Sequence, residues 1–142
     1  MISQSVLKLL KSGYFLELIN NDNLEFYGNF YKDAFKSISD EKVLVVCIIG
    51  SQGSGKSTLL NYAFGTQSIT EEEKSTRGIN FTLQRFPEDI KNESGFSSIL
   101  IIDTEGLHKP GIIDEEFEKK ILLFAMLSAD IILINHKAEI SQ

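Results

Sequence analysis

The pattern of apolar and polar residues along the chain predicts short helices first and buried strands afterwards. Apolar residues recur at helical spacing over residues 4–19, although Gly13 interrupts the pattern, and again over residues 26–38. A run of asparagine and aspartate at 20–23 marks a turn between these two segments. We therefore expect residues 1–40 to form a helical lead-in that packs against the rest of the chain.

Three continuous apolar runs predict strands that are buried on both faces. They cover residues 43–49, 98–103 and 129–135. Runs of this kind, without polar alternation, are typical of a parallel sheet that helices cover on both sides. Residues 79–86 alternate apolar and polar positions instead, which predicts a half-exposed strand that Pro87 ends.

Helices are expected between these strands, and residues 92–95 predict a turn. One helix covers residues 56–64 and ends at Gly65, and another starts after Asp114, where acidic residues suit the helix dipole. The second helix is apolar nearly all round at 121–127, which predicts burial on more than one side. This order of elements predicts a three-layer α/β domain with a mostly parallel sheet. Such a short sheet would leave its last strand exposed, so we expect the chain to be truncated at its C-terminus.

Charge and composition argue against several classes of protein. The chain has 142 residues, which fits a single domain, and its net charge of −6 argues against a nucleic-acid-binding surface. No apolar run approaches the roughly 18 residues of a membrane span, so this segment does not indicate membrane association. The first residues lack the pattern of a secretory signal, and we expect a cytoplasmic location. The single cysteine, Cys47, lies in an apolar run and is expected to be buried rather than reactive.

The segment that follows the first buried strand matches the phosphate-binding pattern G-x-x-x-x-G-K-[ST] in full. The residues that we assign to nucleotide binding here are Gly50, Ser51, Gln52, Gly53, Ser54, Gly55, Lys56, Ser57 and Thr58. The glycines let the backbone curl so that successive N–H groups surround a phosphate, and the next helix adds its positive dipole end. The pattern assigns Lys56 to the outer phosphates and the Ser57 hydroxyl to Mg²⁺. A buried strand enters and a helix leaves, which predicts the P-loop NTPase sandwich fold.

A second motif lies at the end of the second buried strand. Asp103-Thr104-Glu105-Gly106 has the form D-x-x-G, and parallel strands present their carboxyl ends at the edge where the P-loop lies. We therefore expect Asp103 to hold magnesium, usually through water, and the Gly106 N–H to bond to the γ-phosphate. The motif is weak by itself, but at this place relative to the P-loop it supports the same nucleotide site.

The irregular segment between the P-loop helix and the next strand contains a further candidate. Thr76, within STRG at 75–78, can ligate magnesium with its hydroxyl and hold its loop over the γ-phosphate. The alternative is an ordinary loop threonine, and a solvated side chain explains Arg77 better than a role in neutralising charge. The expected metal ligands are therefore Ser57, Thr76 and Asp103, and the expected catalytic residues are Lys56, Thr76 and Gly106.

Together these segments resemble the large GTPases of the dynamin superfamily, in the group of guanylate-binding, atlastin-like and very large interferon-inducible GTPases. The resemblance is carried by GSQGSGKSTLLNYAFGTQ (50–67), STRGI (75–79), IIDTEGL (101–107) and FEKKILLFAMLSADIILINHKAEI (117–140). It is nearest to the very large interferon-inducible branch, and it implies that residues 41–142 are the N-terminal part of a G domain. It also implies that Thr76 is the switch threonine, that Asp103 and Gly106 serve magnesium and γ-phosphate, and that the base is guanine.

The sequence departs from that group at two positions that matter for hydrolysis. Guanylate-binding proteins and atlastins have a catalytic arginine at the P-loop position of Gly53, and Leu107 stands where small GTPases have a glutamine. Hydrolysis without these groups is expected to be slow unless a backbone group, a loop serine or a partner supplies the function. The guanine-reading segment would lie beyond residue 142, so guanine is implied by the resemblance and by no base-contacting residue.

The favoured function is GTP binding with Mg²⁺-dependent GTP hydrolysis. A fragment of such a GTPase need not be active by itself. The resemblance also implies a nucleotide-dependent homodimer of G domains. One alternative is an ATP-binding P-loop protein of the transporter type, which predicts a strand ending in Asp-Glu and a Leu-Ser-Gly-Gly segment that the sequence lacks. The other is a nucleotide-dependent interaction module with little or no hydrolysis, which the missing arginine favours.

Overall fold

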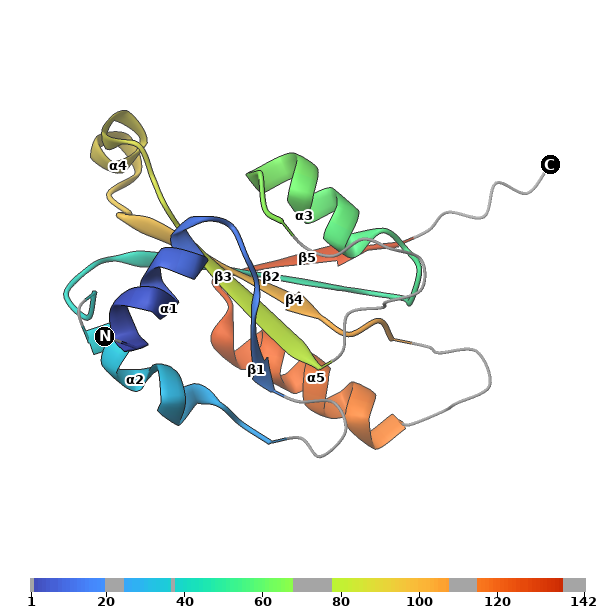
Figure 1. Cartoon of the computed structure of the whole chain (residues 1–142). Helices are drawn as coiled ribbons and strands as arrows, with labels where there is room; N and C mark the ends of the chain where they lie inside the picture. Colours follow the sequence, from blue (N-terminus) through green and yellow to red (C-terminus); the bar gives the residue numbers. More distant parts are fainter. Residues whose placement is uncertain (1, 20–24, 37, 68–77, 108–114, 137–142) are drawn as a thin grey trace.

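The computed structural model describes residues 2–19, 25–36, 38–67, 78–107 and 115–136. In chain order these form α1 (Ile2–Lys11), β1 (Leu16–Ile19), α2 (Gly28–Lys36), β2 (Val43–Gly50), α3 (Lys56–Phe64), β3 (Ile79–Arg85), α4 (Glu88–Ser94), β4 (Ser98–Thr104), α5 (Glu115–Ser128) and β5 (Ile131–Asn135). Helices and strands alternate, as predicted for an α/β domain. Helices pack on both faces of one sheet, so the described part has three layers (Figure 1).

The sheet is mixed rather than mostly parallel. Its strands lie in the order β1-β3-β4-β2-β5. β2 is parallel to β4 and β5, whereas β3 is antiparallel to β4, and β1 is antiparallel to β3. The prediction of a mostly parallel sheet is therefore wrong for the described strands. The physical reason is the connection through α4, which turns the chain back at one end of the sheet instead of crossing over its face.

A strand replaces the second half of the first predicted helix. α1 ends at Lys11, and Gly13 follows with a φ of 81°, a conformation that takes the chain out of the helical path. β1 then pairs with β3, with Leu16 opposite Phe81. The prediction of helix up to residue 19 is wrong, because the edge of β3 offers backbone hydrogen bonds that local periodicity cannot indicate. The proposed division of the chain at residue 40 stays a prediction.

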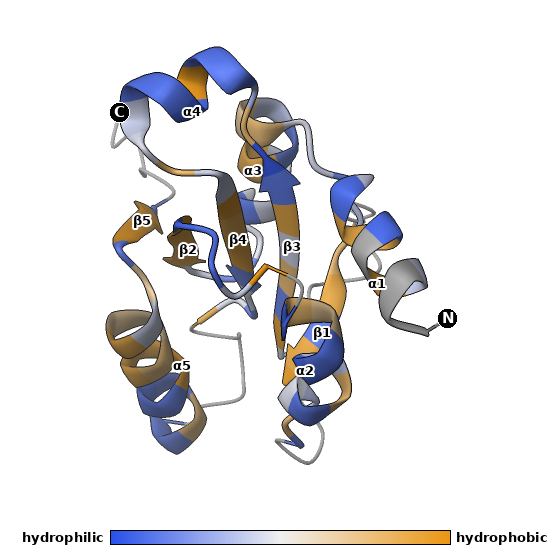
Figure 2. Ribbon diagram, turned by 90° about the vertical axis from the view of Figure 1, so that its left-hand side faces the viewer, coloured by the Kyte–Doolittle hydropathy of each residue, from blue (hydrophilic) through white to orange (hydrophobic). Residues whose placement is uncertain are grey.

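Two groups of buried side chains fill the two faces of the sheet. One group joins α1, α2 and α5 to Cys47 and Phe81, and the other joins Leu60 of α3 to Ile48. Cys47 is fully buried, as predicted. Burial raises the pKa of its thiol to about 12, with a further contribution from the charge of Asp103. Figure 2 shows the resulting contrast between the hydrophobic strands β2 and β4 and the mostly hydrophilic α4.

β3 is more buried than its alternating pattern predicts. Phe81 and Thr82 point to opposite faces, and both are buried. Phe81 packs against the rings of Tyr31 and Phe35, while the Thr82 hydroxyl donates to the Leu10 carbonyl at 3.1 Å. The prediction of a half-exposed strand is therefore wrong, because rings of α2 cover Phe81 on one side and the Leu10 carbonyl near the end of α1 pairs with Thr82 on the other.

α3 is confirmed at both ends, whereas α4 was not predicted. α3 ends at Gly65, which has a φ of 61°, as expected of a glycine after a helix. α4 includes residues 92–94 of the expected turn and four residues before them, and none of its residues is buried. It therefore lacks the apolar periodicity by which a helix is recognised. None of the helices in the described ranges is both long and apolar enough to pass through a lipid bilayer.

α5 and β5 expose apolar side chains at one edge of the sheet. Ala125 is buried, but Met126 and Leu127 are 70% and 79% exposed. The prediction of burial on more than one side is wrong for this helix, because only one of its faces meets the sheet among the described residues. β5 pairs with β2 alone in the described sheet, and Ile134 is 76% exposed. No residue of β5 is buried, so the predicted burial of this strand on both faces is wrong for the described part of the chain, whereas the exposure expected of a last strand is confirmed at Ile134.

Candidate functional site

The P-loop connects β2 to α3 and curls where its glycines allow. Gly53 and Gly55 have φ values of 71° and 86°, in the left-handed region that side chains disfavour. A Cβ added at either residue would have no atom within 4 Å. This open space leaves room for a ligand beside the backbone. Gly55 also precedes α3 directly, so the positive end of that helix dipole faces the same loop.

Lys56 is buried against the P-loop backbone. Its side-chain ammonium donates to the carbonyls of Gly50 and Ser51 at 3.3 and 3.2 Å, and the residue is 6% exposed. Burial lowers the pKa of Lys56, and the negative charge of Asp103 partly opposes this shift. A buried cation is stabilised by a nearby anion more than by neutral carbonyls. Lys56 is therefore placed to bind an anionic group in the loop.

Ser57 and Asp103 lie together, as the two motifs predict. The Ser57 hydroxyl donates to Asp103 Oδ2 at 2.7 Å, and Asp103 is 1% exposed at the end of β4. Hydroxyl and carboxylate oxygens are the hard ligands that Mg²⁺ prefers. Because the hydroxyl hydrogen points to Asp103, the lone pairs of Ser57 Oγ remain for a cation. The chemistry of this donor set fits magnesium.

The D-x-x-G loop lies directly against the P-loop. The Leu107 N–H donates to the Gly50 carbonyl and the Gln52 N–H donates to the Leu107 carbonyl, both at 2.9 Å. A Cβ added at Gly106 would lie 2.4 Å from the Gln52 Cα, which is closer than packed atoms can approach. Glycine is therefore required at position 106 by the contact between the two loops.

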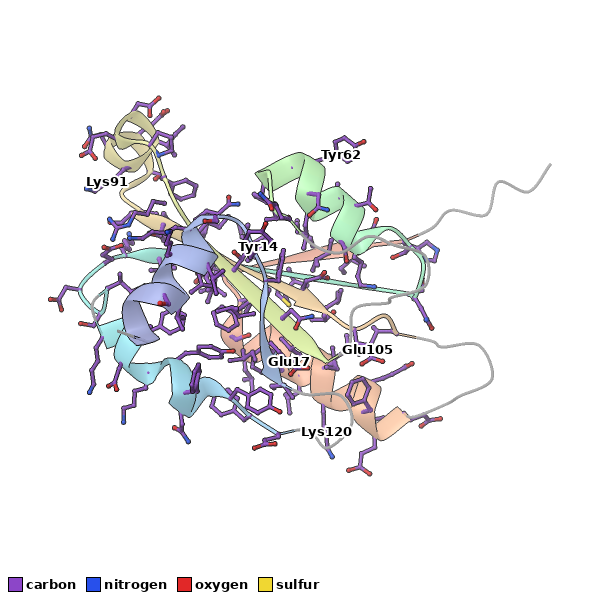
Figure 3. The ribbon with its side chains drawn as sticks, in the orientation of Figure 1. Tyr14, Glu17, Tyr62, Lys91, Glu105 and Lys120 are labelled. Carbon is purple, nitrogen blue, oxygen red and sulfur yellow. The ribbon has the colours of Figure 1, made fainter. Side chains whose placement is uncertain are left out.

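Glu105 is a buried residue that the sequence analysis did not single out. It is 1% exposed, its Oε2 accepts from the Gly78 N–H at 2.8 Å, and its own N–H donates to the Gly78 carbonyl at 2.7 Å. Figure 3 shows Glu105 inside the molecule, whereas Tyr62 projects outward from α3. The two bonds join the D-x-x-G loop to the residue that precedes β3. The only signal in the sequence was its place inside the motif.

Asn135 is the second residue that was not predicted to belong to the site. It lies at the end of β5 opposite Gly50, and its Nδ2 donates to the Ser54 carbonyl at 2.9 Å. A Cβ added at Gly50 would lie 2.1 Å from the Asn135 carbonyl oxygen. The P-loop is therefore bounded by the D-x-x-G loop on one side and by the end of β5 on the other. No motif in the sequence marks this contact.

Most of the predicted site residues come together at the carboxyl ends of β2 and β4. These residues are Gly50, Ser51, Gln52, Gly53, Ser54, Gly55, Lys56, Ser57, Thr58, Asp103 and Gly106. Thr76 lies outside the described residues, so its predicted place beside the magnesium and the γ-phosphate stays a prediction.

Comparison with known proteins points to one family. The family model of the URGCP-like GTPase domain matches residues 1–142. The chain is similar to interferon-induced very large GTPase 1, with 33% identity to the mouse protein over 113 residues (77% of this chain, 5% of that protein). The human protein is 31% identical over 140 residues (94% of this chain, 6% of that protein). Protein SEY1 of Phaeosphaeria nodorum is 33% identical over 120 residues (81% of this chain, 13% of that protein).

These comparisons confirm the predicted resemblance to the large GTPases. The match to the family covers the P-loop, the D-x-x-G loop and also the first 40 residues, in which no motif was found. The chain nevertheless spans a small part of these relatives, 13% of the fungal protein and 5–6% of the mammalian ones.

Proposed function

This chain belongs to the family of URGCP-like GTPase domains, and on that premise we propose that it binds GTP with Mg²⁺ and hydrolyses the γ-phosphate. One observation carries the proposal: the Ser57 hydroxyl and the buried Asp103 carboxylate lie 2.7 Å apart beside the open glycines of the P-loop. A hydroxyl and a carboxylate at this position are the protein groups that a P-loop GTPase uses for Mg²⁺.

In the proposal, both backbone N–H groups and charged side chains bind the nucleotide. In the proposal, the N–H groups from Gly53 to Ser57 surround the phosphates, and Lys56 binds the outer ones. Ser57 and Asp103 hold magnesium together with Thr76, and the Gly106 N–H bonds to the γ-phosphate. Magnesium, when bound, neutralises the charge on the phosphate oxygens. The close contact of Gly106 with the Gln52 backbone holds this glycine against the P-loop, which supports that role.

Hydrolysis by this arrangement is expected to be slow in the isolated chain. Phosphoryl transfer depends on electrostatic stabilisation and on an oriented water, and here Gly53 replaces the P-loop arginine and Leu107 replaces the glutamine of small GTPases. A nucleotide-dependent homodimer, which the resemblance implies, is one source of the missing charge. A nucleotide-dependent interaction module with little hydrolysis is the second candidate, and the same two replacements favour it.

Nucleotide titrations test the proposed binding directly. We expect tighter binding of GTP than of ATP in the presence of Mg²⁺, and Lys56→Ala should weaken GTP binding by about ten- to a hundredfold, because one charge-assisted contact is lost. Lys91→Ala, on the exposed face of α4, is the matched control and should leave the affinity unchanged. Undiminished affinity in Lys56→Ala would contradict the proposal.

Phosphate release separates the hydrolase from the module. The proposal predicts slow release that rises with protein concentration if two chains complete the site. Tight GTP binding with no release at any protein concentration would favour the interaction module instead.

A further inference from the structure

The side chain of Asn135 reaches from the end of β5 to the backbone of the P-loop. Nδ2 donates to the Ser54 carbonyl at 2.9 Å and lies 3.4 Å from the Ser54 hydroxyl oxygen. A carbonyl oxygen can only accept, so the atom that faces it must be the amide nitrogen. We propose that Asn135 is a positioning residue that sets the direction of the Gly55 N–H in the P-loop. This inference rests on the nucleotide binding proposed above.

The geometry of a single peptide unit connects Asn135 to the ligand side of the loop. The Ser54 carbonyl and the Gly55 N–H belong to one planar trans peptide, so they point in opposite directions. The carbonyl points to Asn135 on β5, and the N–H therefore points away from β5. A Cβ added at Gly55 would have no atom within 4 Å, so there is space for a phosphate beside this residue.

Among the described residues, the Asn135 amide makes the one hydrogen bond to this peptide unit. Turning the Ser54–Gly55 peptide over changes only the ψ of Ser54 and the φ of Gly55. Glycine adopts both signs of φ with little penalty, and Gly55 has a φ of 86°. A turned peptide would present a carbonyl oxygen, instead of an N–H, to the phosphate. The Asn135 amide therefore selects the orientation that binds an anion.

β5 makes Asn135 a rigid support for the loop. Asn135 is paired with Gly50 in the parallel ladder between β5 and β2. The Asn135 carbonyl oxygen is so close to Gly50 that a Cβ at position 50 would lie 2.1 Å away. The start of the P-loop is thus packed on the same residue that bonds to its middle. A group held by a strand in this way positions its partner more precisely than a loop residue does.

Two substitutions at Asn135 test the role of its amide. Asn135→Leu keeps a similar shape without a donor, and Asn135→Ala removes the side chain. We expect either to weaken GDP and GTP binding by the same factor, about tenfold, because P-loop N–H groups hold phosphates that both nucleotides share. Ile134→Ala, at the 76% exposed neighbour on the same strand, is the control and should bind as the unaltered chain does.

The amide NMR signal of Gly55 distinguishes positioning from general support of the fold. Addition of GDP should shift this signal in the unaltered chain and in Ile134→Ala, but much less in the Asn135 variants. Their melting temperatures without nucleotide should match that of the control. A parallel loss of melting temperature and affinity would assign Asn135 to the stability of the fold and overturn the inference.

The two proposals fail in different ways. If the unaltered chain binds neither GDP nor GTP, the proposed function fails and this inference falls with it. If the unaltered chain binds and Asn135→Leu binds equally well, only the inference fails. Reduced affinity at an unchanged melting temperature, with a reduced shift of the Gly55 signal, would support both.

Discussion

At the scale of single residues, three charged residues of the P-loop and the D-x-x-G motif are buried. Lys56, Asp103 and Glu105 are each at most 6% exposed. Burial of a charge costs free energy unless the charge is paired and hydrogen-bonded. Each of them is hydrogen-bonded: Lys56 donates to P-loop carbonyls, Asp103 accepts from Ser57, and Glu105 accepts from Gly78. Such costs are typical of sites that bind charged ligands.

The Ser57 hydroxyl should matter only when magnesium is present. Ser57→Ala removes a proposed metal ligand but keeps the P-loop backbone and Lys56. We expect GTP affinity to fall about tenfold in Mg²⁺ and to stay unchanged when EDTA removes the metal, since one hard oxygen ligand is lost. Titrations of GTP in both conditions measure this difference.

A serine outside the site supplies the comparison for that experiment. Ser39→Ala, at an exposed residue, should have no effect in either condition. Equal losses of affinity with and without Mg²⁺ would show that Ser57 supports the loop and is no metal ligand.

At the scale of elements, the D-x-x-G loop is tied to two neighbours. Leu107 is bonded to the P-loop through Gly50 and Gln52, and Glu105 is bonded to Gly78 at the start of β3. Residues 105–107 therefore connect the loop between β2 and α3 to the segment that precedes β3.

Loss of the Glu105 carboxylate should loosen the start of β3. Glu105→Ala leaves the buried Gly78 N–H without its acceptor, and we expect the free energy of unfolding to fall by about 2 kcal/mol. Glu105→Gln keeps an acceptor oxygen, so its free energy of unfolding should fall by less. Denaturant unfolding measures the first effect, and hydrogen exchange at the Gly78 amide measures the local one.

An exposed glutamate on α4 serves as the matched control for Glu105. Glu88→Ala should change neither quantity, because that side chain is 74% exposed. Unchanged exchange at Gly78 in Glu105→Ala would contradict the proposed tie between the two segments.

At the scale of the whole molecule, one edge is apolar and open in the described part. Met126 and Leu127 of α5 and Ile134 of β5 are each at least 70% exposed, and β5 has β2 as its one partner in the described sheet. Exposed apolar side chains beside a free strand edge favour association between chains.

Charges introduced at this edge should reduce self-association of the 142-residue chain. We expect Leu127→Glu combined with Ile134→Lys to lower the weight-average mass measured by sedimentation equilibrium without nucleotide, because apolar contact area is removed. The melting temperature should change little, since both side chains are exposed. Tyr62→Glu, on the outer side of α3 and 87% exposed, is the control. Equal self-association of the double variant and the unaltered chain would contradict this prediction.

Local patterns in the sequence were enough to determine the order of the main elements and the centre of the site. Continuous apolar runs predict β2 and β4, a helical run closed by Gly65 predicts α3, and the place of Cys47 in β2 predicts its burial. The contact between Ser57 and Asp103 could also be predicted, because parallel strands end at the same edge of a sheet. Each of these inferences depends on a residue's own neighbours or on one motif.

Only the tertiary structure decided which strand ends, helix faces and buried groups meet. β1 became a strand because β3 had an edge to pair with, and the direction of β3 followed from the turn made by α4. Glu105 and Gly78 are 27 residues apart in the chain, and Asn135 and Ser54 are 81 apart. Hydrogen bonds between such distant residues depend on how several elements pack together. A local pattern of apolar and polar residues does not predict that packing.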